Sequence, residues 1–522
     1  MRTRLSPFAH NLLFAGTLAT VFALALYLRL SGIDTRPMHS DEAVQAYRVG
    51  TMLAGETFVY DPQDFHGPTL YFFTFWLCKI FGVGSFSELT ETFVRAVPAL
   101  IGALGCILIP LSFFGKRISS VALAGCLLAC SHVAIFYSGY FIQETILVTF
   151  AWCAAGIWCF RKKTLTNAAL AGICAGLAIA SKETWILMAA AFAIGGAAMT
   201  LLRIRFREPG EPAKQLAERF AVATLAAGIV TTFFYSSFGQ NPGGLADFFV
   251  AFKNYFFAGS ATESPHAKPF SYYLLLLYRN SGWLLFWAAL LGVNFLLRAF
   301  FPTKKERKFQ CVFNGRDFSK ILFVFATTLS LFILYSAIPY KTPWCVLGII
   351  PGIALLPLAA LDSRVLMTVR EEAGAAVRSI TALLIFGGLL LLSFFSFLSS
   401  EQNGSVNLYY EHSRKEISKI VSVIEKSKAD FAANGNDDKT FFVALVGPEY
   451  WPLPWYLRRE RFGAWDSIDA VPTQAPVIIA NVDDWAEADA CDTTTKKSRT
   501  IFCAGLRPGV IIEARENFSE AN

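Results

Sequence analysis

Charged residues are scarce in this chain: Asp, Glu, Lys and Arg make up only 16% of its 522 residues, whereas 54% are hydrophobic. Water-soluble proteins usually carry about 25% charged residues, so the composition excludes a soluble globular enzyme. Apolar runs of about 20 residues, the length of a helix that crosses a bilayer, recur along most of the chain. The sequence therefore predicts a polytopic α-helical membrane protein.

Clustered metal-binding side chains are also lacking. The chain has 11 cysteines and 6 histidines, but no CxxC pair and no Cys/His spacing of a structural zinc site occurs. Most cysteines stand singly in apolar segments, where they usually serve as small packing residues. Cys491 and Cys503 instead share a polar tail that we expect outside the cytoplasm, so a disulfide between them is predicted. The alternative is a pair of buried thiols.

The net charge of +7 does not indicate a nucleic-acid partner, because the basic residues lie mainly in short loops between apolar runs. Basic loops usually stay in the cytoplasm, and two apolar runs separate each consecutive pair of them. We therefore expect an inner-membrane protein with about 11 spans, a cytoplasmic N-terminus and an extracytoplasmic C-terminus. The expected spans are 11–30, 92–114, 119–138, 144–160, 167–181, 184–202, 219–237, 281–299, 320–339, 344–362 and 379–399.

Residues 68–82 are apolar and aromatic but number only about 15, which is short for a span. Counting them as a span would also put every later basic loop on the wrong side of the membrane. We expect a short helix that lies in or dips into the outer interface, within a first external loop over 32–91. A second external loop is expected over 239–280.

The composition divides the chain near residue 400. Residues 1–400 form the predicted membrane domain, and residues 401–522 read as globular. In this tail, apolar residues recur at helical spacing over 417–424, and the apolar runs 441–446 and 477–480 are typical of buried strands. We expect a small extracytoplasmic α/β domain.

By this topology, four polar clusters lie at the outer face. A single charged loop is usually just solvated, but ionisable groups at span ends that face a cavity usually mark a substrate path. The clusters are Asp41-Glu42, Tyr137-Ser138-Gly139 with Gln143-Glu144, Ser181-Lys182-Glu183, and Tyr340-Lys341-Thr342-Pro343-Trp344. Carboxylates and lysines at one face suit sugar transfer from a lipid phosphate, in which a base deprotonates the acceptor and cations stabilise the leaving phosphate. One carboxylate base implies inversion, because retention needs a second, nucleophilic carboxylate.

Six motifs resemble those of one known family, in the same order along residues 10–362. Each is weak alone, and their shared order is what carries the resemblance. They are Asp41-Glu42, Phe65 to Tyr71 (Lys/His-Pro-Pro-Leu-Tyr in the family), Arg95 to Leu100 (Arg-Leu-Pro-Ser-Ala-Leu), Tyr137 to Glu144 (Tyr-Ser-Arg and an acid), Ser181-Lys182-Glu183 (Thr-Lys-Gly) and Lys341 to Trp344 (Lys-Xaa-Pro-Tyr). The chain thus resembles the GT-C fold, polyprenyl-phosphate-sugar-dependent glycosyltransferases of the protein O-mannosyltransferase and aminoarabinose transferase group, glycosyltransferase family 39. Its details are most like the flippase-associated glycosyltransferase-like subgroup.

The chain departs from the family pattern at three positions. Gly139 stands where an Arg is usual, Gly67 replaces a Pro, and Glu144 replaces an Asp. The missing Arg removes one cation that could contact the phosphate or the acceptor.

The resemblance implies a role for each matching residue. Asp41 would be the catalytic base, and Glu42 would orient the acceptor or join Asp41 on a divalent ion. Lys182 and Lys341 would hold the phosphate, with Arg279 as a weaker candidate. Further substrate-binding candidates are Tyr137, Glu144 and His66, of which His66 could equally be a metal ligand or an ordinary loop histidine.

The implied function is inverting transfer of a sugar from a polyprenyl-phosphate-linked donor to a lipid, glycan or protein hydroxyl in the cell envelope. The sequence assigns no cofactor, and a divalent metal stays an open alternative. The rival interpretation is a lipid-linked sugar flippase without transferase chemistry, but transporters place their binding groups near the midplane of the membrane. A glycan-binding scaffold would leave Asp41 unexplained. The tail motif Glu449 to Tyr456 is expected to be a lid, an acceptor contact or an aromatic foot in the lipid interface.

Overall fold

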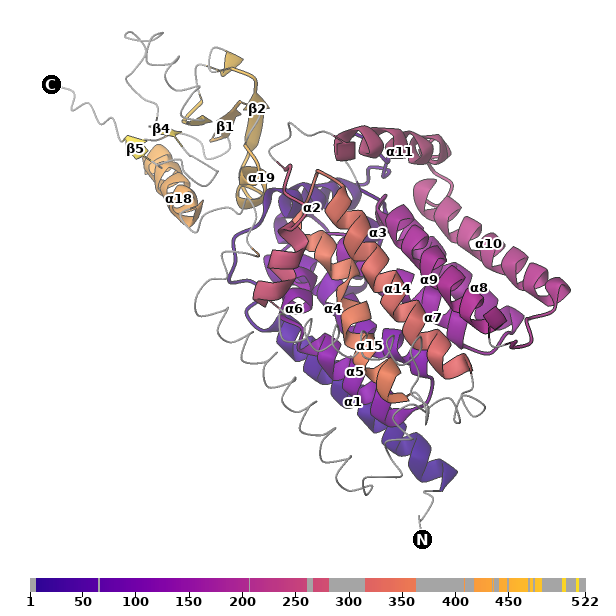
Figure 1. Ribbon diagram of the computed structural model, residues 1–522. Helices are drawn as coiled ribbons and strands as arrows, with labels where there is room; N and C mark the ends of the chain where they lie inside the picture. The colour runs from indigo at the N-terminus through magenta and orange to yellow at the C-terminus, as the bar shows by residue number, and fades with distance from the viewer. Residues whose placement is uncertain are drawn as a thin grey trace. The chain divides into compact units, whose positions relative to one another are not determined.

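The computed structural model groups the chain into two compact units (Figure 1). Unit 1 comprises Met1–Ser31, Thr57–Phe73 and Arg95–Leu408, and unit 2 comprises Gly32–Glu56, Thr74–Val94 and Tyr409–Asn522. The residues that the structure describes are 6–63, 66–205, 207–260, 266–280, 315–362, 408, 417–433, 435, 441–447, 450–467, 470–472, 475–480, 500–503 and 513–515.

Unit 1 is helical, as its long runs of Leu, Ala and Phe predict. Its elements are α1 (Pro7–Leu30), α5 (Ile118–Ala129), α6 (His132–Ser138), α7 (Glu144–Phe160), α8 (Leu165–Ile179), α9 (Trp185–Arg205), α10 (Ala213–Tyr235), α11 (Gly244–Ser260), α14 (Gly315–Ala337), η2 (Pro343–Gly348) and α15 (Ile350–Asp362). Two helices belong to both units: α3 (Thr69–Phe81) and α4 (Glu91–Phe114). Helix α8 packs between α7 and α10, and α9 packs on α14 (Figure 1).

Five of the described helices are long and apolar enough to cross a membrane: α1, α4, α9, α10 and Ser319–Ala337 of α14. Helices α7 and α8 and the segment Pro343–Leu356 match further expected spans but are shorter. The spans expected at 281–299 and 379–399 lie outside the described residues, so the count of about 11 stays a prediction. The short helix expected over 68–82 is present as α3, and its place at the interface also stays a prediction.

Small residues allow the helices to approach closely. Gly172 and Gly176 of α8 form a Gly-xxx-Gly pattern, and a Cβ at these positions would lie 2.2 Å from the Ala223 oxygen and 2.7 Å from the Ala227 oxygen of α10. Gly195 of α9 meets α14 in the same way. Without a hydrophobic driving force inside lipid, such close backbone packing stabilises helix pairs.

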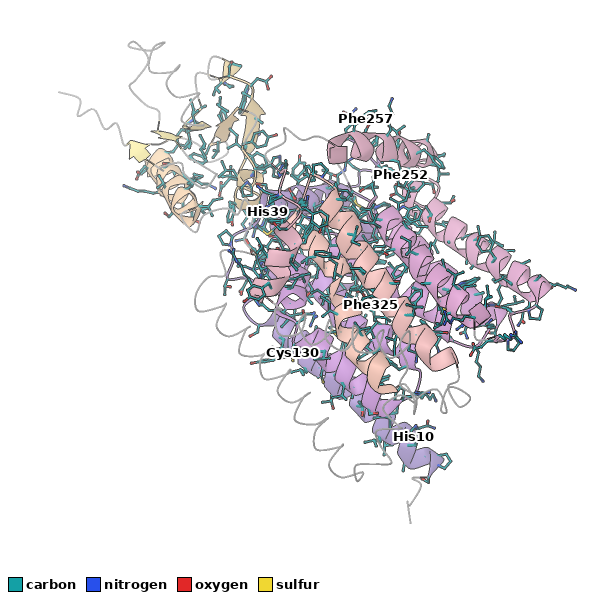
Figure 2. All side chains as sticks on the ribbon, viewed as in Figure 1. His10, His39, Cys130, Phe252, Phe257 and Phe325 are labelled. Atoms are coloured by element: carbon teal, nitrogen blue, oxygen red, sulfur yellow. The ribbon has the colours of Figure 1, made fainter. Side chains whose placement is uncertain are left out.

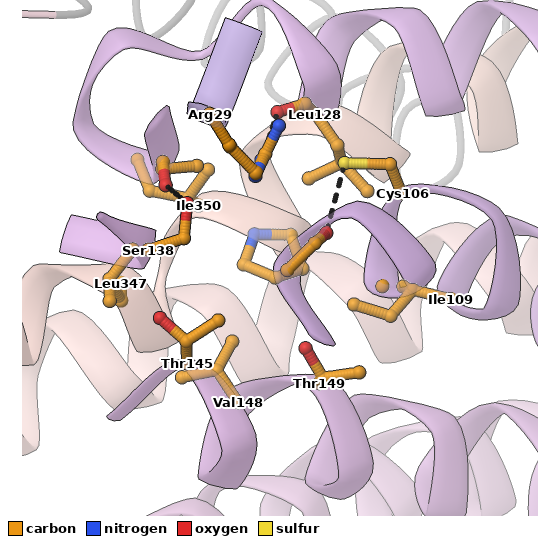
Figure 3. Close-up of a pocket in the computed structure, with 14 residues that line it drawn as sticks. Arg29, Cys106, Ile109, Leu128, Ser138, Thr145, Val148, Thr149, Leu347 and Ile350 are labelled. Atoms are coloured by element: carbon orange, nitrogen blue, oxygen red, sulfur yellow. Dashed lines mark hydrogen bonds between the residues drawn. The ribbon is translucent and has the colours of Figure 1, made fainter. Parts of the chain in front are cut away.

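The segment expected to span the membrane over 119–138 is present as two helices with a bend between them. Helix α5 ends at Ala129, and α6 leaves it at an angle of 64°. The Arg29 guanidinium of α1 donates a 3.3 Å hydrogen bond to the carbonyl oxygen of Leu128, beside which it lies in Figure 3, and another of 3.3 Å to that of Ala129. Because the last carbonyls of a helix lack partners within it and carry partial negative charge, this buried cation stabilises the break.

Unit 2 contains α2 (Ser40–Leu53), η1 (Phe86–Glu88), α18 (Ile417–Ala433), α19 (Leu453–Tyr456) and one sheet. The sheet has the order β2-β1-β3-β4-β5; β1 to β4 are parallel, and β5 is antiparallel to β4. Its strands are β1 (Val443–Val446), β2 (Phe462–Trp465), β3 (Val477–Ala480), β4 (Thr500–Cys503) and β5 (Glu513–Arg515). The helix and the two strands expected in the tail are therefore confirmed as α18, β1 and β3.

The core of the sheet region follows from the spacing of its apolar residues. Ile417, Ile420 and Ile424 lie on one face of α18 and pack with Val443 and Leu445 of β1. Every residue of β1 is buried, as expected for a central strand of a parallel sheet covered on both faces. The division of the chain at residue 400 stays a prediction, because unit 2 also takes in residues from the first loop.

Candidate active site

The acidic pair lies in the first turn of α2, where its two carboxylates have different surroundings. Glu42 is fully buried, and its Oε2 accepts a hydrogen bond of 3.0 Å from the backbone N–H of His39. In return, the Nδ1 atom of His39 accepts a 3.0 Å hydrogen bond from the backbone N–H of Asp41. This reciprocal capping box ties Glu42 to the start of the helix. Figure 2 labels His39 at this point.

The Asp41 side chain, by contrast, is 49% exposed. Its Oδ1 lies 3.8 Å from Nδ1 of His39, and that nitrogen already accepts the hydrogen bond from the Asp41 backbone N–H. The partial positive charge of a helix N-terminus favours a carboxylate at this position. Asp41 is thus the member of the pair that can meet a substrate.

Unit 1 contains a second group of ionisable residues, in the turn between α8 and α9. Lys182 is buried, and its Nζ forms a short ion pair with Oε1 of Glu144 at the start of α7. Burial alone would lower the pKa of Lys182, but the attraction of Glu144 outweighs it, and the pKa is raised above its usual value. Lys182 is therefore charged, with a carboxylate already beside it.

The other carboxylate oxygen of Glu144, Oε2, is buried and has no hydrogen-bond partner within the described part of the chain. The ring of Trp344 lies on another side of the ammonium, with its centroid 6.0 Å from the Lys182 Nζ atom. The structure thus brings together three positions from three of the predicted motifs.

Glu183, the next residue, holds a different set of side chains. Its Oε1 accepts a 2.8 Å hydrogen bond from the Tyr60 hydroxyl, and its Oε2 lies 3.1 Å from Nδ1 of His66. Burial alone would raise the pKa of Glu183, but the charge and hydrogen bond of His66, with the Tyr60 hydroxyl, lower it below its usual value. His66 is therefore oriented by a buried carboxylate, and a quarter of its side chain, 25%, stays exposed.

The Gly67 that replaces the family's Pro has a structural reason. A Cβ atom on Gly67 would lie only 2.4 Å from the carbonyl oxygen of Ala180. The backbone N–H of Thr69 donates a 3.1 Å hydrogen bond to that same oxygen. The Thr69 hydroxyl also lies 2.8 Å from the Ser181 hydroxyl. The chain before α3 is thereby fixed against the end of α8, beside Lys182.

Lys341 has a different environment from Lys182. Its backbone N–H donates a 3.0 Å hydrogen bond to the carbonyl oxygen of His266. Its buried Nζ donates to the carbonyl oxygens of Lys268, at 2.9 Å, and of Ile338. Burial lowers the pKa of Lys341. The charge is thus held by neutral dipoles, whereas that of Lys182 is held by a carboxylate.

The remaining candidates are not brought into these groups. Tyr137 is buried, and its hydroxyl donates a 3.0 Å hydrogen bond to the Leu408 carbonyl oxygen, which is a structural contact. Arg279 is exposed on the helical segment 272–280. Cys491 lies outside the described residues. Among the described residues, no group of three or more His, Cys, Asp or Glu side chains is placed to hold a metal ion.

A cavity elsewhere in unit 1 is lined by Arg29, by Gly102, Gly105 and Cys106 of α4, and by hydroxyl residues of α6 and α7 (Figure 3). None of the predicted catalytic or phosphate-binding residues is among those that line it. Sequence reasoning missed His39 and Tyr60. It named Glu183 within the Ser181-Lys182-Glu183 cluster but gave it no role of its own.

Comparisons with known proteins bear on this arrangement. Residues 19–239 match the family described as dolichyl-phosphate-mannose-protein mannosyltransferase. The predicted family resemblance is confirmed. The matched region includes the acidic pair, His66, Glu144 and the Lys182 turn, and through it the predicted class of enzyme, a glycosyltransferase, is also confirmed. No curated protein sequence matches the chain.

Solved structures agree on the fold. ArnT from Cupriavidus metallidurans bound to undecaprenyl phosphate has a TM-score of 0.53 at 17% identity, over 92% of this chain and 89% of that one. Its apo state gives 0.52 at 17% identity, over 91% and 87%. The apo oligosaccharyltransferase of Archaeoglobus fulgidus gives 0.50 at 14% identity, over 89% and 65%. The chain has the predicted GT-C fold and is an integral membrane protein.

Proposed function

We propose that this glycosyltransferase moves a sugar, with inversion, from a polyprenyl-phosphate-linked donor to a hydroxyl group of a lipid, glycan or protein on the extracytoplasmic face of the membrane. Two likenesses support the donor class. The family match names a dolichyl-phosphate sugar, and the similar ArnT structure holds undecaprenyl phosphate. The sequence motifs that carry the resemblance lie in the expected outer loops.

The observation that carries the proposal is the difference between Asp41 and Glu42. A general base must reach the proton that it removes. Glu42 is buried and committed to the backbone of His39, whereas the Asp41 carboxylate is half exposed. Asp41 is therefore the proposed base, and Glu42 is a residue that holds it in place through the helix start.

The phosphate of the donor needs a cation, and the two lysines differ in what they can offer. Lys182 would have to share its charge with Glu144. Lys341 would only exchange neutral carbonyl oxygens for negatively charged phosphate oxygens, which attract its ammonium more strongly. Lys341 is thus the primary proposed phosphate ligand, with Lys182 and Arg279 as secondary ones.

His66 is proposed as a hydrogen-bond donor to the sugar. Glu183 and Tyr60 hold its ring in one orientation, and a group so held loses little freedom when a ligand binds. A divalent ion shared by Asp41, Glu42 and His66 is the less favoured alternative, because Glu42 already serves the helix cap.

The test compares wild-type protein with Asp41→Asn, purified into liposomes that contain undecaprenyl-phosphate-linked sugars, with extracted membranes as the acceptor source. We expect Asp41→Asn to bind undecaprenyl phosphate normally but to lose turnover by about 100-fold or more, the scale of general-base catalysis. A flippase would instead move the lipid across the bilayer without sugar transfer. Transfer by Asp41→Asn at the wild-type rate would remove Asp41 from the role of base.

A further inference from the structure

The aromatic segment of the tail, Tyr450–Tyr456, has no role in the function proposed above. It follows β1 in the sequence and includes the short helix α19. In the sheet order β2-β1-β3-β4, the connection after β1 leads to one side and the connection after β3 leads to the other, so a switch point lies between β1 and β3. In open parallel sheets, the loops at the carboxyl ends of the strands beside such a switch point are where functional contacts form. Here the contacts of this loop are with the rest of unit 2.

Two hydrogen bonds connect the aromatic segment to the residues directly before Asp41. The backbone N–H of Met38 donates to the Tyr456 hydroxyl at 2.9 Å. The Ser40 hydroxyl donates to the carbonyl oxygen of Trp451 at 3.3 Å. These two anchors lie on either side of His39, the residue that caps α2.

Ring contacts support the same attachment. The Trp451 ring meets the Tyr47 ring of α2 edge-on, with centroids 5.9 Å apart. The fully buried Trp455 ring lies 5.9 Å from that of Phe86 in η1, and its Nε1 donates a 2.6 Å hydrogen bond to Oε1 of Glu91. Aromatic pairs of this geometry stabilise beyond their buried area.

A third contact lies just beyond the segment. Arg458 donates a 2.9 Å hydrogen bond from Nε to the Leu89 carbonyl oxygen, and its guanidinium stacks 4.2 Å from the Trp455 ring centroid. Tail residues thus contact two segments of the first loop within unit 2, residues 38–47 and residues 86–91. This contradicts a role for Trp455 as a foot in the lipid interface.

We propose that the aromatic segment is a positioning element of the active site: it fixes the backbone of residues 38–40 and thereby sets the direction of the Asp41 carboxylate. The inference rests on the proposed function, in which Asp41 is the base. The C-terminal domain then contributes to catalysis without touching the substrate. A displacement of about 1 Å at a catalytic group can lower the rate by about 100-fold, so a few such contacts have a measurable effect.

The test uses Tyr456→Phe in the full-length protein, which keeps the ring and removes the oxygen that accepts from Met38. Tyr450→Phe is the matched control, because the Tyr450 hydroxyl makes no hydrogen bond within the described part of the chain. Two quantities are measured: amide hydrogen exchange in peptides covering residues 36–43, and transfer from undecaprenyl-phosphate-mannose. Exchange reports the backbone contact whether or not the protein transfers sugar.

We expect Tyr456→Phe to speed exchange in this peptide, to lower kcat by roughly 2- to 10-fold, the range that one hydrogen bond supplies, and to leave the KM for the donor unchanged. Adding Ser40→Ala should lower kcat further. Unchanged exchange would overturn the contact, and faster exchange with unchanged kcat would overturn the positioning role. Either result is distinct from failure of the proposed function, which shows as full transfer by Asp41→Asn.

Discussion

At the start of α2, one carboxylate of an adjacent acidic pair is half exposed, whereas in the turn between α8 and α9 both ionisable residues are buried and paired. Lys182 meets Glu144, and Glu183 meets His66 and Tyr60. Leaving either of these buried charges without its partner would cost several kcal/mol. The α8–α9 turn is therefore fixed by its own charges, and the start of α2 leaves one charge available for chemistry.

The two lysines repeat this contrast within unit 1. The ammonium of Lys182 has a carboxylate partner, and that of Lys341 has carbonyl partners. Removing these two identical side chains should therefore have different effects. Loss of the Lys182 side chain should mainly lower the stability of the protein, and loss of the Lys341 side chain should mainly lower its affinity for the donor.

The largest expected effect comes from breaking the buried pair. Glu144→Gln and Lys182→Met should each destabilise the protein by about 3–5 kcal/mol, because each leaves one buried charge without its partner. The double variant should recover most of this loss. Thermal unfolding in detergent measures it, with Asp41→Asn as the exposed control, which should change stability by less than about 0.5 kcal/mol. Equal losses of stability in all three single variants would contradict the difference between the buried pair and the exposed Asp41.

The second effect concerns Lys341. Lys341→Ala should weaken binding of undecaprenyl phosphate by about ten- to a hundredfold, since it removes a charge-assisted contact of about 1.5–3 kcal/mol, whereas the exposed Lys79→Ala should not. Because burial lowers the pKa of Lys341, bound phosphate must restore its proton at alkaline pH. Wild-type affinity should therefore fall as pH rises, beginning below the pKa of an ordinary lysine.

Lys341→Ala should lose that pH dependence along with the affinity. Titration calorimetry of both proteins at neutral and at alkaline pH measures the affinity and its pH dependence separately. Retained affinity in Lys341→Ala, with a loss in Lys182→Met at matched stability, would exchange the roles of the two lysines.

A smaller effect is expected at Glu183, whose pKa is lowered in the folded protein. Folding therefore favours the charged form of Glu183. Its contribution to stability is present above the pKa of an unfolded Glu and is lost as pH falls through the lower pKa of the folded protein. Glu183→Gln should reduce the melting temperature near neutral pH, and the difference from wild type should shrink in acid. A difference independent of pH would mean that Glu183 is not ionised in the folded state.

Sequence patterns found the elements that depend on neighbouring residues and missed those that depend on distant ones. Apolar runs located α1, α3 and α4 to within a few residues. The break between α5 and α6 could not be predicted, because the Arg29 side chain that stabilises it lies 99 residues before Leu128. The pairing of Glu144 with Lys182, 38 residues apart, was equally hidden, although both residues had been selected.

The role of Glu42 at the start of α2 could not be predicted for a different reason. Capping boxes usually begin with Ser or Thr, and here His39 takes that position, so the role of Glu42 was not visible in the sequence. The resemblance gave both adjacent acids a role at the substrate, and only burial and the His39 hydrogen bond show that Glu42 belongs to the helix start.

The smallest effect tests that distinction. Glu42→Gln keeps an oxygen that can accept from the His39 N–H and should leave both stability and transfer nearly unchanged, whereas Glu42→Ala should cost about 0.5–2 kcal/mol of stability, the range for a lost helix cap. Melting temperature and kcat, measured on the same preparations, separate the two variants. If Glu42→Gln lowered kcat as far as Asp41→Asn, the two carboxylates would act together, as on a shared divalent ion. Restored activity of Glu42→Gln at high Mn²⁺ or Mg²⁺ would then identify that ion and end the contrast between the two acids.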